Sequence, residues 1–322
     1  MRGSTLLGWT GEGSIADLSN AARGVLKAER RKATLRESGG TVVIDGDRPT
    51  ETAHMLANLP GVSWVGVGHS SGTLDGAYQE LAGLAKTYLR KRGSFWIRPE
   101  ARGSSPTPGE LTGRAVGVVL DAVKGSRVRE NAPSAVFTLG WDGRAGTAGV
   151  ILALGPGGVP TGEATVACLV SGGMHSSVTA WYALLAGLRV ELVHARVSDE
   201  SLREVARLYA ELSHRVNPEA LKLRVLEGQT IRDAIASWAE AQTGEIFSGV
   251  HGWRTGRGVV PRKARAPLLL LPEEGFESAF SGLGVRGYSP QPAETSTGHA
   301  STRQLTFGGV RTDMNGVLDG LR

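Results

Sequence analysis

The sequence has little cysteine and no long hydrophobic run, and both absences narrow the class of protein. The single cysteine among 322 residues, Cys168, excludes an internal disulfide framework and favours the cytoplasm as the location. No apolar run approaches the roughly 20 residues that a membrane-spanning helix needs. The first residues, Met1–Leu7, are too few and too soon polar for a signal peptide. We therefore expect a cytoplasmic protein with no membrane partner.

Two common nucleotide-binding signatures are also missing. The chain has neither the Gly-Lys-Ser/Thr of a Walker A loop nor a Gly-x-Gly-x-x-Gly fingerprint after a strand. No repeat of 20–50 residues is present, which excludes solenoids and propellers. Hydrophobic residues make up 40% of the chain and charged residues 21%, as in a globular protein with two or three domains.

The centre of the chain contains a strand, a glycine turn and the start of a helix. The short apolar run Thr165–Val170 is typical of a strand buried on both faces. Glycines follow, and an apolar pattern with helical spacing then continues through Trp181 and Leu188. Backbone N–H groups of such a turn and helix start converge on one point and can hold a phosphate. The alternative is an ordinary strand-to-helix turn. The residues that would line the cradle are Ser171, Gly172, Gly173, His175, Ser176 and Ser177.

Positive charge is concentrated in one segment. The whole chain carries a formal charge of +5. The segment Lys86–Arg129 alone has ten basic and three acidic residues, which is a net charge of +7. Such a concentration indicates a polyanionic partner. The alternative is a solvated helix face.

The apolar pattern places helices and strands along the first half of the chain. Helices are predicted over residues 14–31, 50–59, 74–92 and 110–123. Strands are predicted over residues 41–44, 62–67, 95–98, 135–139 and 150–154, with a loop over 103–109. The β-α-β-β-α-β rhythm of residues 1–75 suggests a ferredoxin-like unit, and residues 74–153 form a second unit. A further strand is predicted over 190–195, and a short helix over 310–321.

Five motifs, taken in order, resemble the 4-thiouridine synthetase (tRNA sulfurtransferase) family. The resemblance covers about residues 10–285, and its specificity comes from the order and spacing of the motifs. The five motifs are LPGV at 59–62, IRPEARG at 97–103, VRENAP at 128–133, GPGGVPTG at 155–162 and SGGMHS at 171–176.

The resemblance implies an α+β N-terminal half followed by an α/β doubly wound parallel-sheet domain. It divides the chain into an N-terminal ferredoxin-like domain over 1–75 and a THUMP RNA-binding domain over 76–162. A PP-loop ATP-pyrophosphatase-like domain would follow over 163–288, and a flexible C-terminal tail over 289–322.

The family's chemistry implies partners and cofactors. Its N-terminal domains hold tRNA, and the PP-loop domain uses ATP to adenylate the C4 oxygen of a uridine. A cysteine persulfide then delivers sulfur and releases AMP. ATP and Mg²⁺ are the implied cofactors, since a carboxylate places the metal on the pyrophosphate. The implied partners are tRNA and a sulfur-carrier protein, and a homodimer is an alternative to the monomer because family members can dimerise.

The resemblance also assigns site residues. The residues that match the family's ATP-binding pyrophosphate loop are Ser171, Gly172, Gly173, Ser176 and Ser177. His175 stands in the same loop. His194 lies near the end of the next strand, and Ser248 and Gly249 match a later turn that closes over the nucleotide. The residues that match the basic surface of the RNA-binding domain are Arg98, Arg102, Lys124, Arg127 and Arg129.

The chain departs from the family at the positions that carry chemistry. His175 replaces the loop aspartate, and Pro272-Glu273 stands where the family usually has Asp-Lys. Cys168 lies inside the predicted strand, so the persulfide step has no visible carrier. Three interpretations follow: a tRNA-modifying 4-thiouridine synthetase relative, a catalytically inactive tRNA-binding paralogue with a degenerate nucleotide pocket, or an adenylating PP-loop enzyme without sulfur transfer.

Overall fold

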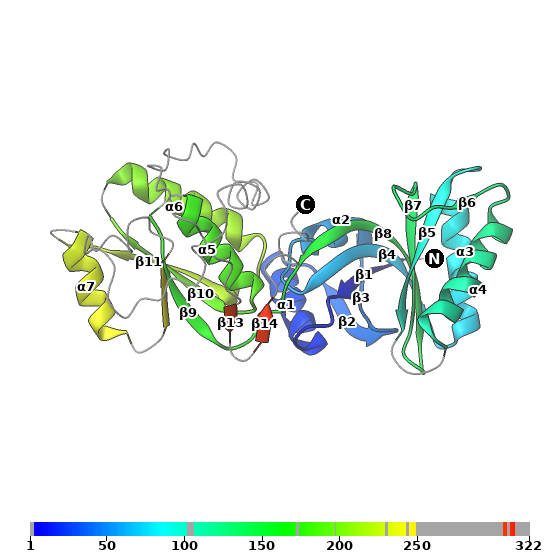
Figure 1. The fold of residues 1–322 in the computed structure, drawn as a ribbon, viewed down its shortest axis with the longest axis horizontal. Coiled ribbons are helices and arrows are strands. Elements are labelled where there is room, and N and C mark those ends of the chain that lie inside the picture. The colour runs from blue at the N-terminus through cyan, green and yellow to red at the C-terminus, as the bar shows by residue number, and fades with distance from the viewer. Residues whose placement is uncertain are drawn as a thin grey trace. The chain divides into compact units, whose positions relative to one another are not determined.

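A computed structural model describes residues 3–101, 106–171, 174–196, 198–228, 231–242, 245–248, 305–307 and 310–312. The chain forms two compact units, Met1–Gly155 and Pro156–Arg322 (Figure 1). Among the helices in the described residues, none has the length and hydrophobicity needed to cross a bilayer.

The first part of unit 1 alternates strands and helices. Its strands stand in the order β2-β3-β1-β4, and β1 is antiparallel to both of its neighbours. This is the connectivity of the split β-α-β motif. The elements are β1 (Ser4–Trp9), α1 (Ile15–Ala28), β2 (Ala33–Ser38), β3 (Thr41–Gly46), α2 (Pro49–Leu56) and β4 (Val62–Ser71).

The two helices predicted in this part are confirmed, although both end three residues earlier than predicted. The hydroxyl of Ser14 accepts a hydrogen bond from the N–H of Ala16 and so caps α1. Leu18, Ala22 and Val25 of that helix are buried, as their spacing predicted. Pro49 begins α2, in a position where its missing N–H costs nothing.

The rest of unit 1 extends the same sheet. Its elements are α3 (Leu74–Tyr88), β5 (Ser94–Ala101), α4 (Pro108–Ala122), β6 (Arg127–Val128), β7 (Ala135–Trp141) and β8 (Gly146–Gly157). Strands β5, β6 and β7 are parallel, and β8 is antiparallel to β7. Strand β8 also lies beside β4, so that unit 1 has one eight-stranded sheet in the order β2-β3-β1-β4-β8-β7-β5-β6 (Figure 1). The two units predicted from the sequence therefore share a sheet.

Helices bury the two main hydrophobic clusters of this sheet. Leu18, Val25 and Leu56 of α1 and α2 pack with Leu7 and Val65 of the strands. Leu81 and Leu84 of α3 and Leu111 of α4 pack with Phe95 and Phe137. These clusters supply the largest favourable term in the folding of unit 1.

Trp64 fills a separate site in the sheet. Its side chain is fully buried, and its indole N–H donates to the Glu100 carboxylate over 2.8 Å. Gly8 makes room for the ring, because a Cβ on Gly8 would lie 2.0 Å from the indole nitrogen. The pairing fixes Glu100, which also accepts from the guanidinium of Arg98 over 3.2 Å.

Unit 2 is built on a parallel sheet in the order β11-β10-β9-β12. Helices α5 and α6 pack on one face, and α7 contributes Ile235 and Trp238 to a second cluster with Leu169 and Val193. The elements are β9 (Thr165–Leu169), α5 (Met174–Leu185), β10 (Arg189–Ala195), α6 (Asp199–Ser213), a 3₁₀ turn (Pro218–Ala220), β11 (Leu221–Leu226), α7 (Ile231–Ala241) and β12 (Glu245–Ser248). The predicted α/β alternation with a parallel sheet is confirmed.

The GPGGVPTG motif has a packing role in unit 2. Gly158 has a φ of +75°, and a Cβ there would lie 2.3 Å from the carbonyl oxygen of Leu185, at the end of α5. The next residue, Val159, donates its N–H to the same carbonyl oxygen over 2.7 Å. Glycine therefore lets this segment bond directly to the helix end.

The C-terminal predictions fall mostly outside the described residues. Strands β13 (Leu305–Phe307) and β14 (Val310–Thr312) form an antiparallel pair. The helix predicted over 310–321 is therefore wrong at its start, where strand pairing with β13 decides the local structure. The rest of the predicted tail over 289–322 is not among the described residues, and neither is Pro272-Glu273.

Candidate functional site

The topology of unit 2 singles out the carboxyl ends of β9 and β12. From β9 the chain moves outward through β10 to β11, then returns to β12 on the other side of β9. Ligands of open parallel sheets bind at the strand carboxyl ends where the direction of winding reverses. Leu169 of β9 stands directly opposite Ser248 of β12. The strand ends that precede the predicted glycine turn and the predicted later turn therefore lie side by side.

Two serines are hydrogen-bonded to each other where the predicted glycine turn begins. The backbone N–H of Ser171 donates to the Ser176 hydroxyl over 3.2 Å, and the two hydroxyl oxygens are 3.5 Å apart. Ser176 and Ser177 are 1% and 2% exposed, whereas Ser171 is exposed. Of the other predicted ATP contacts, Gly172, Gly173 and Gly249 lie outside the described residues. The structure describes only the backbone of His175, in the first turn of α5, and of Ser248.

His194 joins three elements next to this turn. Its side chain is 1% exposed. The Nδ1 atom lies 3.0 Å from the carbonyl oxygen of Val170, and Nε2 lies 3.2 Å from the hydroxyl of Ser201 near the start of α6. Since both nitrogens have partners, the imidazole holds the ends of β9 and β10 and the start of α6 together.

Neither sulfur nor metal chemistry has a visible site in the described residues. The Cys168 side chain is fully buried in β9, and burial raises the pKa of its thiol. In the described ranges, no group of three or more His, Cys, Asp or Glu residues could hold a metal ion. The described residues therefore do not fit Mg²⁺.

A second candidate site lies where β5 and β6 begin. Ser94 is opposite Arg127 in the parallel pair, and the N–H of Arg127 donates to the carbonyl of Gly93 over 3.1 Å. The N–H of Arg129 donates to Phe95 over 2.9 Å. These bonds place the turn after α3 beside the turn after α4. We call the cations at the end of α3, in the two turns, and in and directly after β6 the basic edge: Lys86, Arg90, Lys91, Arg92, Lys124, Arg127 and Arg129.

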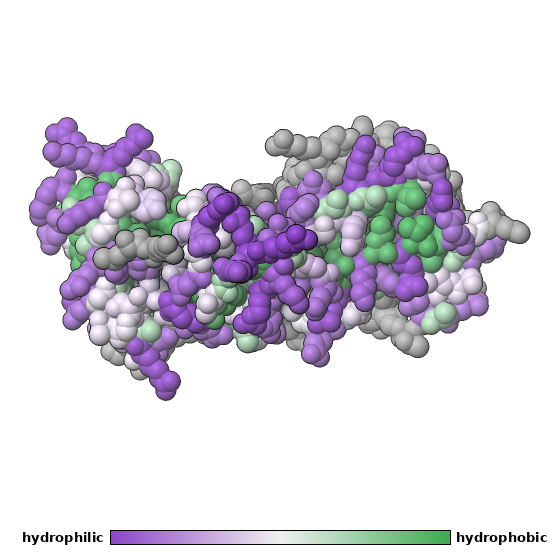
Figure 2. Space-filling view, turned by 180° about the vertical axis from the view of Figure 1, so that it is seen from behind, coloured by the Kyte–Doolittle hydropathy of each residue, from purple (hydrophilic) through white to green (hydrophobic). Residues whose placement is uncertain are grey.

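The cations of the basic edge are all exposed. Exposed apolar side chains lie among them in sequence, with Tyr88 43% and Val128 42% exposed. Figure 2 shows hydrophilic residues around a small hydrophobic area at the end of unit 1 that carries α3 and α4, on the left of that view. Lys124 also pairs with Asp121 over 3.0 Å, and such an exposed pair contributes little.

The structure groups only some of the predicted RNA contacts. Lys124, Arg127 and Arg129 lie together on the basic edge. Arg98 lies four residues farther along β5 than Ser94, about 13 Å away at ~3.3 Å per residue. Its guanidinium is bonded to Glu100 beside Trp64. Arg102 lies outside the described residues.

The residue assignments made from the sequence missed the cations that end α3. Lys86, Arg90, Lys91 and Arg92 belong to the +7 segment, but no motif singled them out. Arg92 has a φ of +64°, and its Cγ would lie 3.5 Å from a Cβ built on Gly125. The sequence showed that these charges are clustered along the chain. It did not show the pairing of β5 with β6, which brings the two turns together.

Comparison with known proteins identifies the fold. No protein-family model matches the chain, and no curated protein matches it in sequence. The chain is similar in structure to PH1313 from Pyrococcus horikoshii Ot3, with a TM-score of 0.68 and 15% identity over 88% of this chain and 99% of that one. It is similar to a 4-thiouridine synthetase in a complex with RNA and bound ATP, with a TM-score of 0.63 and 15% identity over 88% of this chain and 86% of that one. At these identities the likeness shows that the chain has the fold of these two proteins.

Proposed function

We propose that this protein binds tRNA through its basic edge and uses ATP to adenylate a tRNA uridine for sulfur transfer, as 4-thiouridine synthetases do. The observation that carries the proposal is the basic edge itself, seven exposed cations at the end of α3, in the turns after α3 and α4, and in and directly after β6. The likeness to a 4-thiouridine synthetase bound to RNA and ATP supports both the partner and the cofactor.

The basic edge has the chemistry that RNA requires. Arginine and lysine neutralise phosphates and release counterions, which supplies most of the affinity for a nucleic acid. Arginine side chains donate several hydrogen bonds to phosphate oxygens in a fixed geometry. The exposed ring of Tyr88 offers a surface on which an unpaired base can stack.

The nucleotide part of the proposal depends on the carboxyl edge of β9. Ser171, Ser176, Ser177 and the first turn of α5 would hold the phosphates of ATP through backbone N–H groups and hydroxyls. ATP supplies the adenylyl group that makes the uridine C4 oxygen a leaving group. His194 keeps the strand ends and α6 in place around the turn. The domain boundaries at residues 75, 162 and 288, the later turn at Gly249 and a homodimer remain parts of this proposal.

The burial of Cys168 decides whether this residue can take part in the last step of the proposed reaction, which is sulfur transfer to the adenylated uridine. A fully buried thiol with a raised pKa cannot attack a bound substrate. We therefore assign sulfur delivery to a carrier protein. The second candidate function, a catalytically inactive tRNA-binding paralogue, rests on the same burial together with His175 in place of the loop aspartate.

Charge-removing variants test RNA binding. Fluorescence anisotropy would measure the affinity for unmodified tRNA at several salt concentrations. The triple variant Lys124→Gln/Arg127→Gln/Arg129→Gln should bind about 10- to 100-fold more weakly. The slope of log affinity against log salt should fall by about 1 for each phosphate that the variant no longer neutralises.

The matched control removes the same charge from unit 2. Arg203→Gln/Arg207→Gln/Lys222→Gln changes three exposed cations and should leave the affinity and its salt slope nearly unchanged. Equal weakening by both triple variants would show that only overall charge matters and would contradict the assignment to the basic edge.

A further inference from the structure

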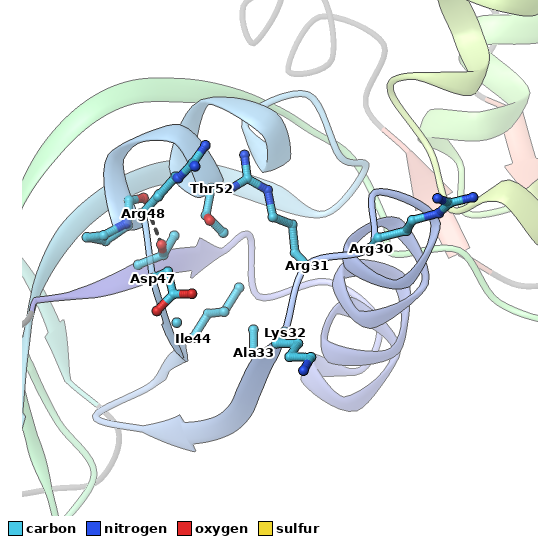
Figure 3. Close-up of a pocket in the computed structure, with 11 residues that line it drawn as sticks. Arg30, Arg31, Lys32, Ala33, Ile44, Asp47, Arg48 and Thr52 are labelled. Carbon is cyan, nitrogen blue, oxygen red and sulfur yellow. Dashed lines mark hydrogen bonds between the residues drawn. The ribbon is translucent and has the colours of Figure 1, made fainter.

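A cavity of about 310 Å³ lies in unit 1 between the turn after α1 and the connection from β3 to α2 (Figure 3). Its lining includes the apolar side chains of Ala33 and Ile44. Polar groups come from Arg31, Lys32, Asp47 and Thr52. This volume is at the lower end of the range for small-molecule sites.

The turn after α1 determines which cations border the cavity. Arg30 has a φ of +54°, its N–H donates to Lys27, and the N–H of Arg31 donates to Leu26 over 2.8 Å. This is the Schellman ending of a helix, in a position that usually holds glycine. Figure 3 shows the Arg30 side chain directed away from the cavity, with the Arg31 side chain on the Thr52 side of it.

Two guanidiniums near the cavity share one carboxylate. Arg31 Nη2 lies 2.8 Å from Glu51 Oε2, and Arg48 Nη1 lies 3.3 Å from the same oxygen. The hydrogen bonds from Arg31 and Arg48 lower the pKa of Glu51. Each guanidinium has five N–H donors, and Figure 3 shows both of them near Thr52. Within the described residues, their remaining donors are left for a ligand.

Thr52 adds a hydroxyl to the lining. The residue is 7% exposed, and its hydroxyl makes no side-chain hydrogen bond to any residue that the structure describes. The other threonine of the lining, Thr5, by contrast donates to the carbonyl of Pro49 over 2.8 Å. A hydroxyl in a cavity lining that has no protein partner can donate to a ligand and accept from it.

We propose that this cavity binds a ribose phosphate, with Arg31, Arg48 and the hydroxyl of Thr52 on the phosphate oxygens. Asp47 accepts a hydrogen bond from a sugar hydroxyl, and Ala33 and Ile44 lie against the apolar side of the sugar. Guanidinium pairs are the usual partners of phosphate, and the Asp47 carboxylate favours a hydroxyl-bearing ligand over a bare anion. The same ribose phosphate can be free or can be the end of an RNA chain, so this proposal does not depend on RNA binding by the basic edge.

Calorimetric titration of the full chain tests the proposal, with ribose 5-phosphate, inorganic phosphate and ribose as separate probes. Two forms of one short single-stranded RNA, with a 5′-phosphate and with a 5′-hydroxyl, distinguish the sources. Tighter binding of ribose 5-phosphate than of phosphate or ribose supports a free ligand. A preference for the 5′-phosphorylated RNA alone supports an RNA end. No binding of ribose 5-phosphate and no discrimination between the two RNAs would overturn the proposal.

Variants locate the binding in this cavity. Thr52→Val keeps the side-chain shape and removes the hydroxyl, and Arg31→Gln/Arg48→Gln removes the two phosphate ligands. Each should weaken binding of the preferred probe at least 10-fold. The arginine double variant keeps the test valid if Thr52→Val lowers the melting temperature. Arg23→Gln on α1 changes an exposed arginine that does not line the cavity and should have no effect. Equal weakening by Arg23→Gln would also overturn the proposal.

Discussion

The Nδ1 atom of His194 lies 3.0 Å from the carbonyl oxygen of Val170. The N–H of Val170 donates to the carbonyl of Val193 over 2.9 Å, so the carboxyl end of β9 is tied to β10 through both backbone and side chain. Because the glycine turn begins at the next residue, Ser171, this pairing sets the position from which the turn starts. His194 is therefore a positioning residue of the carboxyl edge.

Replacement of His194 should destabilise unit 2. His194→Phe approximates the ring volume but leaves Val170 and Ser201 without their side-chain partner, which should cost about 1–3 kcal/mol. Urea unfolding followed by circular dichroism measures this loss. The exposed His214, which ends α6, supplies the control: His214→Gln should change stability by less than about 0.5 kcal/mol. Equal effects of the two variants would show that the His194 bonds contribute nothing.

Loss of the Ser176 hydroxyl should weaken ATP binding. Ser176→Ala removes the acceptor of the Ser171 N–H and so loosens the turn. ATP should raise the melting temperature of the native protein, because a ligand that binds only the folded state stabilises it. The variant should require about 10-fold more ATP for the same shift. Ser213→Ala, which loses a bond to Ala210 at the end of α6, is the control. No effect of ATP on the native protein would contradict the nucleotide site and favour the inactive paralogue.

The thiol of Cys168 should be unreactive in the folded protein. Its side chain is fully buried between Leu192 of β10 and Phe247 of β12 in the sheet register, and burial raises its pKa. A thiol reagent at pH 8 should label the protein only after denaturant is added. Cys168→Ser should leave tRNA binding unchanged. Rapid labelling of the native protein would contradict burial and would make Cys168 a candidate persulfide carrier.

The carboxylate of Asp142 should make the free energy of unfolding depend on pH. Burial alone would raise the pKa of Asp142, but hydrogen bonds from the N–H groups of Ala145, Arg144 and Gly39 outweigh it and lower the pKa below its usual value. The Gly39 bond, over 2.9 Å, joins residues 103 positions apart. Asp142→Asn should cost about 1–2 kcal/mol near neutral pH.

The pH dependence of this loss follows from the direction of the pKa shift. A lowered pKa gives stability that is present above the unfolded-state value, about 3.9, and is lost as the pH falls through the folded-state value. The difference between the native protein and Asp142→Asn should therefore shrink below about pH 4. Asp121→Asn, on a side chain that is 84% exposed, should show no comparable difference. A difference that stays constant down to pH 2 would contradict this role of Asp142.

Local patterns predicted helices α1 to α5 and strands such as β3, β4 and β10, because the relevant interactions are near in sequence. Ser14 caps α1 shortly before its first buried position, and the apolar spacing of that helix is complete within four turns. Helix α6 was not located, and neither were strands β1, β2, β11, β12 and the two-residue β6. The backbone bonds of β1 go to β3 and β4, and those of β6 go to β5, across intervals that no short window contains.

By itself, the sequence determined the parallel α/β unit, the start of α5 shortly after β9 and the excess of positive charge between Lys86 and Arg129. The tertiary structure alone decided which of those charges lie together, because parallel pairing of β5 with β6 brings Arg92 and Arg127 to one end while Arg98 stays with Trp64 and Glu100. It also decided that Arg31 and Thr52, from different elements, line one cavity. The sequence gives the chemical type of each side chain. Which side chains lie close together depends on hydrogen bonds and packing between segments that are distant in the sequence.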